Sequence, residues 1–199
     1  MLASANAHKA AEIEAIVGGR LHLVPRPAEV PDVVEDADTF EGNARLKAVA
    51  VTSATGEAAL SDDSGLEVDA LDGAPGVWSA RYTGPGATDD ANVVKLLAAL
   101  ADRPEAADRR ARFRSVVVLH RPDGSEVVAA GTVSGSIADR PRGDGGFGYD
   151  PVFVPDGGDG STFAELDPDA KHAISHRGRA LHALLAALGA EGEAGSPTP

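Results

Sequence analysis

Two runs of β-forming residues, 112–120 and 126–133, constrain the fold of this chain more than any other feature. They are joined through Pro122-Asp123-Gly124, a turn sequence that predicts an antiparallel hairpin. Segments with helical spacing lie before and after the hairpin, and the sequence has no internal repeat. We therefore expect one α/β domain over residues 1–190, followed by a disordered tail at 191–199.

Capping residues and glycines predict the ends of four helices. Asn6 is expected to cap a helix over residues 7–17, and the sequence around Thr39 to begin a second helix that stops at Gly56. Thr88 and Ser175 are expected to cap a third and a last helix. Further strands are expected at residues 21–24, 66–71 and 151–154.

Composition excludes several kinds of site and partner. The 199 residues include no cysteine, which excludes disulfides and thiolate metal sites. A net charge of −13 argues against a nucleic-acid polymer as partner, but a small polyanion is allowed where a few cations converge. No apolar run approaches the roughly 18 residues needed to span a bilayer, and the N-terminus lacks a signal pattern. We therefore expect no membrane association and, by elimination, a cytoplasmic location.

The segment Ser61-Asp62-Asp63-Ser64-Gly65 places two adjacent carboxylates after the short apolar run 58–60. This pattern predicts a strand that runs into a turn and presents oxygen ligands of the kind that Mg²⁺ prefers. Solvated turn-forming residues are the alternative. If the backbone were extended at this point, Asp62 and Asp63 would point to opposite faces, and only one of them could face a given ligand.

Groups suited to phosphate and metal binding lie nearer the N-terminus. Residues 4–9 open the first helix, where unpaired N–H groups and the Lys9 cation suit a phosphate. An Asn6-capped surface helix with a solvated lysine is the alternative. Glu35 lies too far upstream of the second helix to be explained by the helix dipole, so it is a candidate metal ligand.

Two later segments contain groups that could contact a planar base. Residues 145–151 combine three glycines with two aromatic side chains, so that Phe147 could stack on a base and Asp150 could accept from a ring N–H. A flexible loop with core aromatics is the alternative. Lys171 and Arg177, placed by this prediction at the start of the last helix, would oppose its dipole, and an anion or an acceptor-rich ligand explains them better.

Five motifs, in order along residues 3–188, resemble the Ham1/RdgB family of inosine and xanthosine triphosphate diphosphatases. They are Ser4-Ala5-Asn6-Ala7-His8-Lys9 and residues 61–66, 73–82, 145–151 and 174–178. The resemblance implies a mixed sheet with flanking helices, arranged as two lobes around a central substrate cleft. It also implies a homodimer, Mg²⁺ as cofactor, and hydrolysis of the purine nucleoside triphosphates ITP, dITP and XTP to the monophosphate and pyrophosphate.

The resemblance further assigns roles to single residues. Asp63 matches the general base and a metal-associated acid, and Glu35 matches the upstream metal ligand. The residues that match substrate contacts are Ser4, Ala5, Asn6, Ala7, His8, Lys9, Ser64, Phe147, Gly148, Tyr149, Asp150, Lys171, His176 and Arg177. This chain departs from the family's usual Thr-Gly-Asn at Ser4-Ala5-Asn6, where alanine removes the backbone freedom of glycine.

The reaction expected from these roles is attack of water on a phosphorus of the α–β linkage, with Asp63 as base and Mg²⁺ bound by Glu35 and Asp63. Selectivity is expected from donation by His176 or Arg177 to the 6-oxo group of the base. A Maf-like pyrophosphatase for other modified nucleotides and a non-catalytic nucleotide-binding protein are the alternatives.

Overall fold

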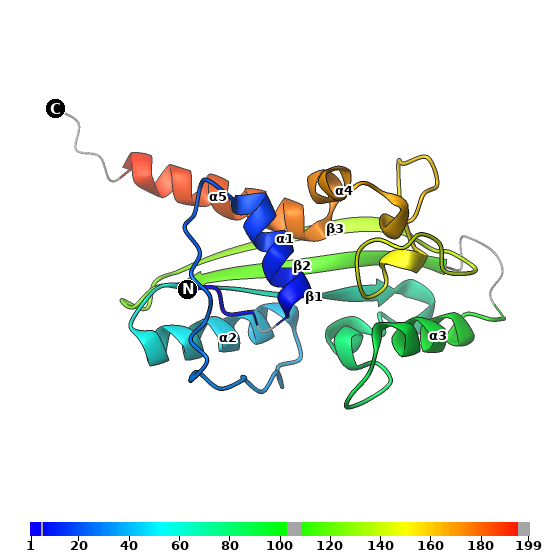
Figure 1. Cartoon of the computed structure of the whole chain (residues 1–199), viewed down its shortest axis with the longest axis horizontal. Coiled ribbons are helices and arrows are strands. Elements are labelled where there is room, and N and C mark those ends of the chain that lie inside the picture. The colour runs from blue at the N-terminus through cyan, green and yellow to red at the C-terminus, as the bar shows by residue number, and fades with distance from the viewer. Residues whose placement is uncertain (5, 103–108, 195–199) are drawn as a thin grey trace. The chain divides into compact units, whose positions relative to one another are not determined.

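The computed structural model describes residues 1–4, 6–102 and 109–194, which form two compact units (Figure 1). The first unit comprises Met1–Asp63, Ser115–Gly131 and Arg177–Pro199, and the second comprises Ser64–Arg114 and Thr132–His176. Four strands hydrogen-bond in the order β1-β2-β3-β4. Their bounds are Ala59–Val68 for β1, Arg110–His120 for β2, Glu126–Ile137 for β3 and Phe153–Pro155 for β4. The mixed α/β fold and the predicted β2–β3 hairpin are confirmed.

Helices α1 (Ala7–Val17) and α2 (Phe40–Thr55) belong to the first unit, as does nearly all of α5 (His176–Ala194). Asn6 caps α1 as predicted, because its Oδ1 accepts from the N–H groups of the second and third helical residues. Thr39 caps α2 by accepting from a first-turn N–H, and Gly56 ends that helix at a φ of 72°. Local capping chemistry therefore sets these boundaries.

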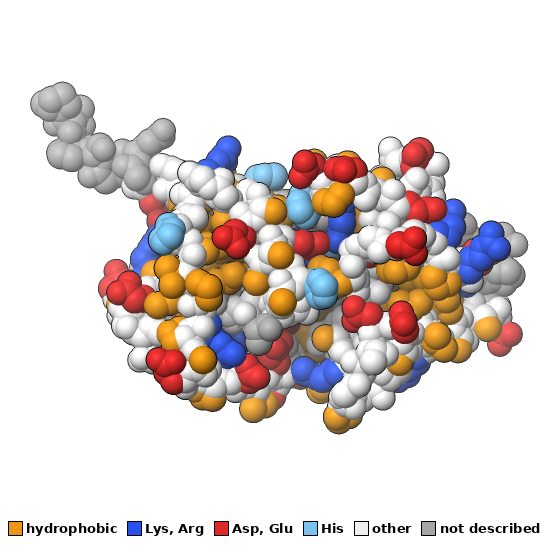
Figure 2. All heavy atoms as spheres, viewed as in Figure 1, with side chains coloured by type: hydrophobic (Ala, Val, Ile, Leu, Met, Phe, Trp, Pro, Cys, Tyr) orange, Lys and Arg blue, Asp and Glu red, His pale blue; other side chains and the backbone are white. Residues whose placement is uncertain are grey.

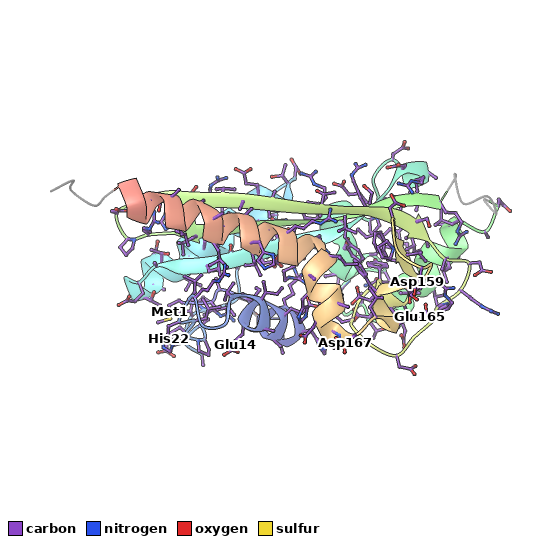
Figure 3. The ribbon with its side chains drawn as sticks, turned by 90° about the horizontal axis from the view of Figure 1, so that it is seen from above. Met1, Glu14, His22, Asp159, Glu165 and Asp167 are labelled. Atoms are coloured by element: carbon purple, nitrogen blue, oxygen red, sulfur yellow. The ribbon has the colours of Figure 1, made fainter. Side chains whose placement is uncertain are left out.

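Helices α1 and α5 cover one face of the strands in the first unit, and α2 covers the other (Figures 1 and 3). The buried core beneath α1 and α5 includes Leu2, Ile13, Val17, Leu60, Val117, Val127, Ala180, Leu181 and Leu184. On the α2 face, Val51 packs against Ala59. The Ser61 hydroxyl donates to the Ala44 carbonyl at 2.5 Å, which fixes β1 to α2.

The second unit is built around an aromatic core. The ring of Phe113 lies 4.7 Å from that of Phe153 and 5.9 Å from that of Phe163, centroid to centroid. Strand β4 pairs antiparallel with β3, and Ile137 is opposite Phe153. Helices α3 (Asp89–Ala99) and α4 (Pro168–Ile174) belong to this unit, with the short helices η1 (Asp69–Leu71), η2 (Gly76–Arg81), η4 (Asp150–Val152) and η5 (Phe163–Glu165). Thr88 caps α3 as predicted.

Three predictions about strands and one about a turn are corrected by the structure. The acidic segment does not form a turn, because β1 continues without a break through Asp62 and Asp63 to Val68. Its polar side chains find partners in the tertiary structure, which outweighs their turn propensity. Of the strand expected at 66–71, residues 66–68 form the end of β1, and residues 69–71 form the short helix η1.

The strand expected at residues 21–24 is not formed. The adjoining residue, Pro25, makes a single parallel bridge with Leu2, and a proline cannot donate to a longer ladder. The strand expected at 151–154 is displaced to Phe153–Pro155, because η4 occupies the residues before it. Of the tail expected at 191–199, residues 191–194 continue α5, and residues 195–199 lie outside the described residues.

No helix within the described ranges is long and apolar enough to cross a membrane. Acidic side chains are spread over the face of the molecule shown in Figure 2, in keeping with the net charge of −13.

Gly135 lies on β3 opposite Pro155 and leaves no space for a side chain. A Cβ at this position would lie 2.2 Å from the Val154 carbonyl oxygen. We expect Gly135→Ala to lower the free energy of unfolding by about 1–3 kcal/mol, as for other overpacked sites, measured by urea denaturation. At Gly158 the nearest atom would be 3.7 Å away, so Gly158→Ala is the control. An equal loss in both variants would contradict this account of the β3–β4 contact.

Candidate active site

The extended backbone of β1 sends its two adjacent carboxylates to opposite faces of the strand. Asp62 points toward the side covered by α1 and α5, where it meets Lys9 and Arg177. Asp63 points toward α2, where it meets Lys47. The backbone is therefore extended at Asp62 and Asp63, which is the condition under which the sequence predicted that they point to opposite faces. The two residues have different surroundings.

Asp63 is a buried carboxylate whose two oxygens have different environments. Its Oδ1 lies 3.3 Å from the Lys47 ammonium and 3.9 Å from that of Lys9. Its Oδ2 is buried and has no hydrogen-bond partner among the described residues. Burial raises the pKa of Asp63 above the ordinary aspartate value; Lys47 and Lys9 oppose that shift, while Glu35 and Asp62 add to it. A carboxylate with a raised pKa and an unused oxygen can accept a proton.

Asp62 lies in a network that satisfies it fully. Its Oδ1 accepts from the Ser115 hydroxyl at 2.5 Å, and its Oδ2 lies 3.1 Å from the Lys9 ammonium and 3.3 Å from the Arg177 guanidinium. The guanidinium also donates to Glu12. Burial alone would raise the pKa of Asp62, but Arg177, Lys9 and the Ser115 hydroxyl together hold it well below the ordinary range. Asp62 therefore remains charged and anchors its neighbours.

The N-terminal segment places Lys9 beside both carboxylates. Asn6 Oδ1 accepts from the N–H groups of His8 and Lys9 at 2.9 and 3.1 Å, so the cap itself uses two of the amides expected to hold phosphate. The Ser4 hydroxyl makes local hydrogen bonds with the backbone of Asn6. Ala7 begins α1, and Ala5 lies outside the described residues.

Glu35 and Asp63, the two metal ligands expected from the sequence, share one cation. The Lys47 ammonium lies 3.1 Å from Glu35 Oε2 and 3.3 Å from Asp63 Oδ1. Within the described ranges no group of three or more metal-binding side chains is found. Two carboxylates nevertheless fit Mg²⁺, which commonly keeps several waters and takes its other ligands from substrate phosphates. The Lys47 ammonium lies at the position where these two carboxylates already bind a positive charge.

The second unit contains most of the residues expected to contact the base, whereas Arg177 belongs to the first unit. Asp150 Oδ2 accepts from the Phe147 N–H at 2.9 Å and from the Lys171 ammonium at 2.7 Å. The ammonium also lies 5.2 Å from the centre of the Phe147 ring and 5.9 Å from that of Phe163. Asp150 therefore orients a ring and a cation. Gly146, at φ +70°, allows this arrangement, because a Cβ there would lie 2.2 Å from Asp150 Oδ2.

Gly148, Tyr149 and His176, which are also expected to contact the substrate, are held by neighbouring residues of the second unit. The Gly148 N–H donates to Asp89 at 2.7 Å, and the Tyr149 hydroxyl donates to the Ser79 carbonyl at 2.9 Å. The His176 ring stacks on Phe113 at 4.6 Å with 8° between the planes. Ser64 follows Asp63 in β1 and is the first residue of this unit.

Lys171 does not open the last helix, as its sequence position suggested. It lies in the last turn of α4, a helix that the sequence did not predict, and α5 begins later, at His176. A cation in a last turn is favoured by the helix dipole, so the argument that Lys171 opposes the dipole is wrong. Its buried contact with Asp150 is the feature that now calls for an explanation.

Several partners of the site residues were missed from the sequence: Glu12, Lys47, Asp89, Phe113, Ser115 and Phe163. Lys47 had a detectable signal. It lies three residues after Ala44 and four before Val51, both buried on α2, so it shares the apolar face of that helix. A lysine on an apolar helix face needs a buried partner, which is a reason to pair it with an acid.

Asp62→Asn should destabilise the protein by about 3 kcal/mol, because it leaves the buried Arg177 with one carboxylate fewer. The depressed pKa of Asp62 means that its contribution is present at neutral pH and is lost progressively below about pH 5. Urea denaturation at pH 7 and at pH 3 should therefore show a larger difference from wild type at pH 7. Asp32→Asn, at an exposed ion pair, is the control. A constant difference at both pH values would refute the ion-pair assignment.

Comparison with known proteins matches this arrangement to one family. The model of the Ham1 family matches residues 1–187. A dITP/XTP pyrophosphatase of Geobacter sulfurreducens is 48% identical over 96% of this chain and 97% of its own length, and one of Nocardia farcinica is 49% identical over 96% and 94%. The solved Ham1 proteins of Coxiella burnetii and Staphylococcus aureus superpose with TM-scores of 0.86 and 0.84 at 42% identity. They cover 95% and 96% of this chain, with 97% of each solved chain matched. This chain belongs to the Ham1 family.

Proposed function

We propose that this protein hydrolyses deaminated purine nucleoside triphosphates, namely dITP, XTP and ITP, to the monophosphate and pyrophosphate. Relatives with nearly half of their residues identical over almost the whole chain are named dITP/XTP pyrophosphatases. The observation that carries the proposal is the state of Asp63: a buried carboxylate with a raised pKa and an unpartnered oxygen, beside two lysines.

Asp63 is the proposed general base. Its Oδ2 accepts a proton from water as the water oxygen bonds to the phosphorus of the α–β linkage. The bond from that phosphorus to the bridging oxygen breaks, and pyrophosphate leaves with the electron pair. The buried Oδ2 supports this role, because it has no hydrogen-bond partner among the described residues and so can accept the proton.

The cations beside Asp63 are proposed to bind the triphosphate. Lys9 and Lys47 carry ammonium groups within 4 Å of the carboxylate, so they can stabilise negative charge that develops on the phosphate oxygens. Mg²⁺ bound by Glu35 and Asp63 would neutralise further charge on the phosphates. Asp62 holds Lys9 in place and takes no part in proton transfer.

The purine base of the substrate is proposed to contact Phe147 and Lys171, the two residues of the second unit that Asp150 holds in place. Phe147 offers a ring face, while Lys171 and His176 offer donors to a 6-oxo group. Arg177 is a weaker candidate for that donation than the sequence suggested, because its guanidinium is 2% exposed and bound by Asp62 and Glu12. Adenine presents an amino group at the same position, which leaves a buried donor unpaired.

Two further parts of the proposal rest on the family resemblance: Mg²⁺ as the cofactor and a homodimer as the working form. A cytoplasmic location is proposed by elimination, from the composition of the sequence.

Asp63→Asn should reduce pyrophosphate release from ITP by at least about a thousandfold, because the amide cannot take up the proton. The same variant should unfold at the wild-type temperature or above it. The raised pKa of Asp63 means that the folded protein favours the uncharged form, so its ionised carboxylate costs stability at neutral pH. Turnover is measured by pyrophosphate release and stability by calorimetry. Asp69→Asn, at an exposed carboxylate on η1, is the control. Near-normal turnover in Asp63→Asn would remove Asp63 from the mechanism.

Pyrophosphate release across ITP, XTP, GTP and ATP, with Mg²⁺ and with a chelator, tests the function as a whole. We expect rapid release from ITP and XTP, slow release from ATP, and loss of activity with the chelator. A preference for ATP would refute the assignment. Binding of ITP without release of pyrophosphate would instead support a non-catalytic nucleotide-binding protein.

A further inference from the structure

Lys47 occupies the position between the two carboxylates that are assigned to the metal. Its ammonium lies 3.1 Å from Glu35 Oε2 and 3.3 Å from Asp63 Oδ1, and its side chain is 12% exposed. Asp63 is itself 8% exposed at the side chain, and its Oδ2 is buried with no hydrogen-bond partner among the described residues. The two carboxylates therefore already bind one ammonium, and Asp63 Oδ2 beside it is an acceptor without a hydrogen-bond partner among the described residues.

The other cation near this pair is committed elsewhere. Lys9 lies 3.9 Å from Asp63 but 3.1 Å from Asp62, with which it makes the closer contact. Lys47 is thus the nearer of the two lysines to Asp63, and the same ammonium lies 3.1 Å from Glu35. Without it, the buried carboxylate of Asp63 would lie near the partly exposed carboxylate of Glu35 with no ammonium between them, and the two negative charges would repel each other.

A divalent cation bound to Glu35 Oε2 and Asp63 Oδ1 would lie close to the ammonium that already contacts these two oxygens. Mg²⁺ requires carboxylate oxygens at about 2.0–2.1 Å, and an ammonium within hydrogen-bond distance of the same oxygens would repel it strongly. The two cations therefore compete for these oxygens. Lys47 stands on a flexible four-carbon stem, so it can withdraw without a change in the backbone of α2.

We propose that Lys47 is the resident cation of the Glu35–Asp63 pair in the metal-free protein and that a divalent metal has to displace it. This proposal rests on the proposed function only for the identity of the metal ligands. Displacement makes metal binding to the free protein weak. Metal binding becomes favourable when the triphosphate, a polyanion, offers the Lys47 ammonium another partner. The metal and the triphosphate therefore bind with positive cooperativity.

The test measures Mn²⁺ binding to the nucleotide-free protein by the loss of the free Mn²⁺ electron paramagnetic resonance signal. Lys47→Met keeps the length of the side chain and removes its charge, so we expect the Kd for Mn²⁺ to fall at least about tenfold. Lys47→Arg keeps a cation and should bind Mn²⁺ like the wild type. Lys95→Met, which removes a lysine that contacts Tyr82 in the second unit, is the matched control and should also be unchanged.

An unchanged or higher Kd in Lys47→Met would overturn the proposal, as would a fall of the same size in Lys95→Met. If metal-free Lys47→Met does not fold, Mn²⁺ should restore its circular dichroism spectrum, since the metal takes the place of the missing ammonium. A variant that stays unfolded with saturating Mn²⁺ would also overturn the proposal. No nucleotide is used, so a failure of the proposed function, seen as no pyrophosphate release, is recorded separately from this result.

Discussion

The continuous extension of β1 through Asp62 and Asp63 is the constraint on which the rest of the site depends. Because side chains alternate along a strand, one carboxylate meets the residues of α1 and α5, and the next meets Lys47 on α2. A shift of one residue in this strand would exchange their surroundings and remove both sets of partners. The hydrogen bond from Ser61 to the Ala44 carbonyl holds the register on the α2 side.

Two neighbouring aspartates acquire opposite properties from these surroundings. Asp62 has a guanidinium, an ammonium and a hydroxyl, which overcome the cost of its burial, so its pKa is lowered. Asp63 shares one ammonium with Glu35 and leaves one oxygen unpartnered, so burial prevails and its pKa is raised. The first arrangement stabilises the fold. The second costs stability and leaves a group able to do chemistry, a combination that is typical of active sites.

The features predicted correctly from the sequence are those fixed by local chemistry. The caps at Asn6, Thr39 and Thr88 depend on a side chain and the N–H groups of the next turn, and a short window of sequence contains both. The acidic segment was predicted as a turn because its residues favour turns locally, and only partners far away in sequence keep it extended. Ser115, for example, meets Asp62 across 53 residues. The contacts of Lys47 with Glu35 and Asp63 were missed for the same reason, although its helical spacing gave a hint.

An acidic chain can handle a polyanion if its cations are stored beside carboxylates and not exposed. Lys9, Lys47 and Lys171 each lie against at least one buried aspartate, so their charge is neutralised in the free protein and adds little to the field around it. A stored ammonium has already lost most of its water, which lowers the cost of transferring it to a phosphate oxygen. Such a transfer leaves a carboxylate behind. At Glu35 and Asp63 the proposed divalent cation would match that charge, so an exchange of cations would keep these two carboxylates neutralised.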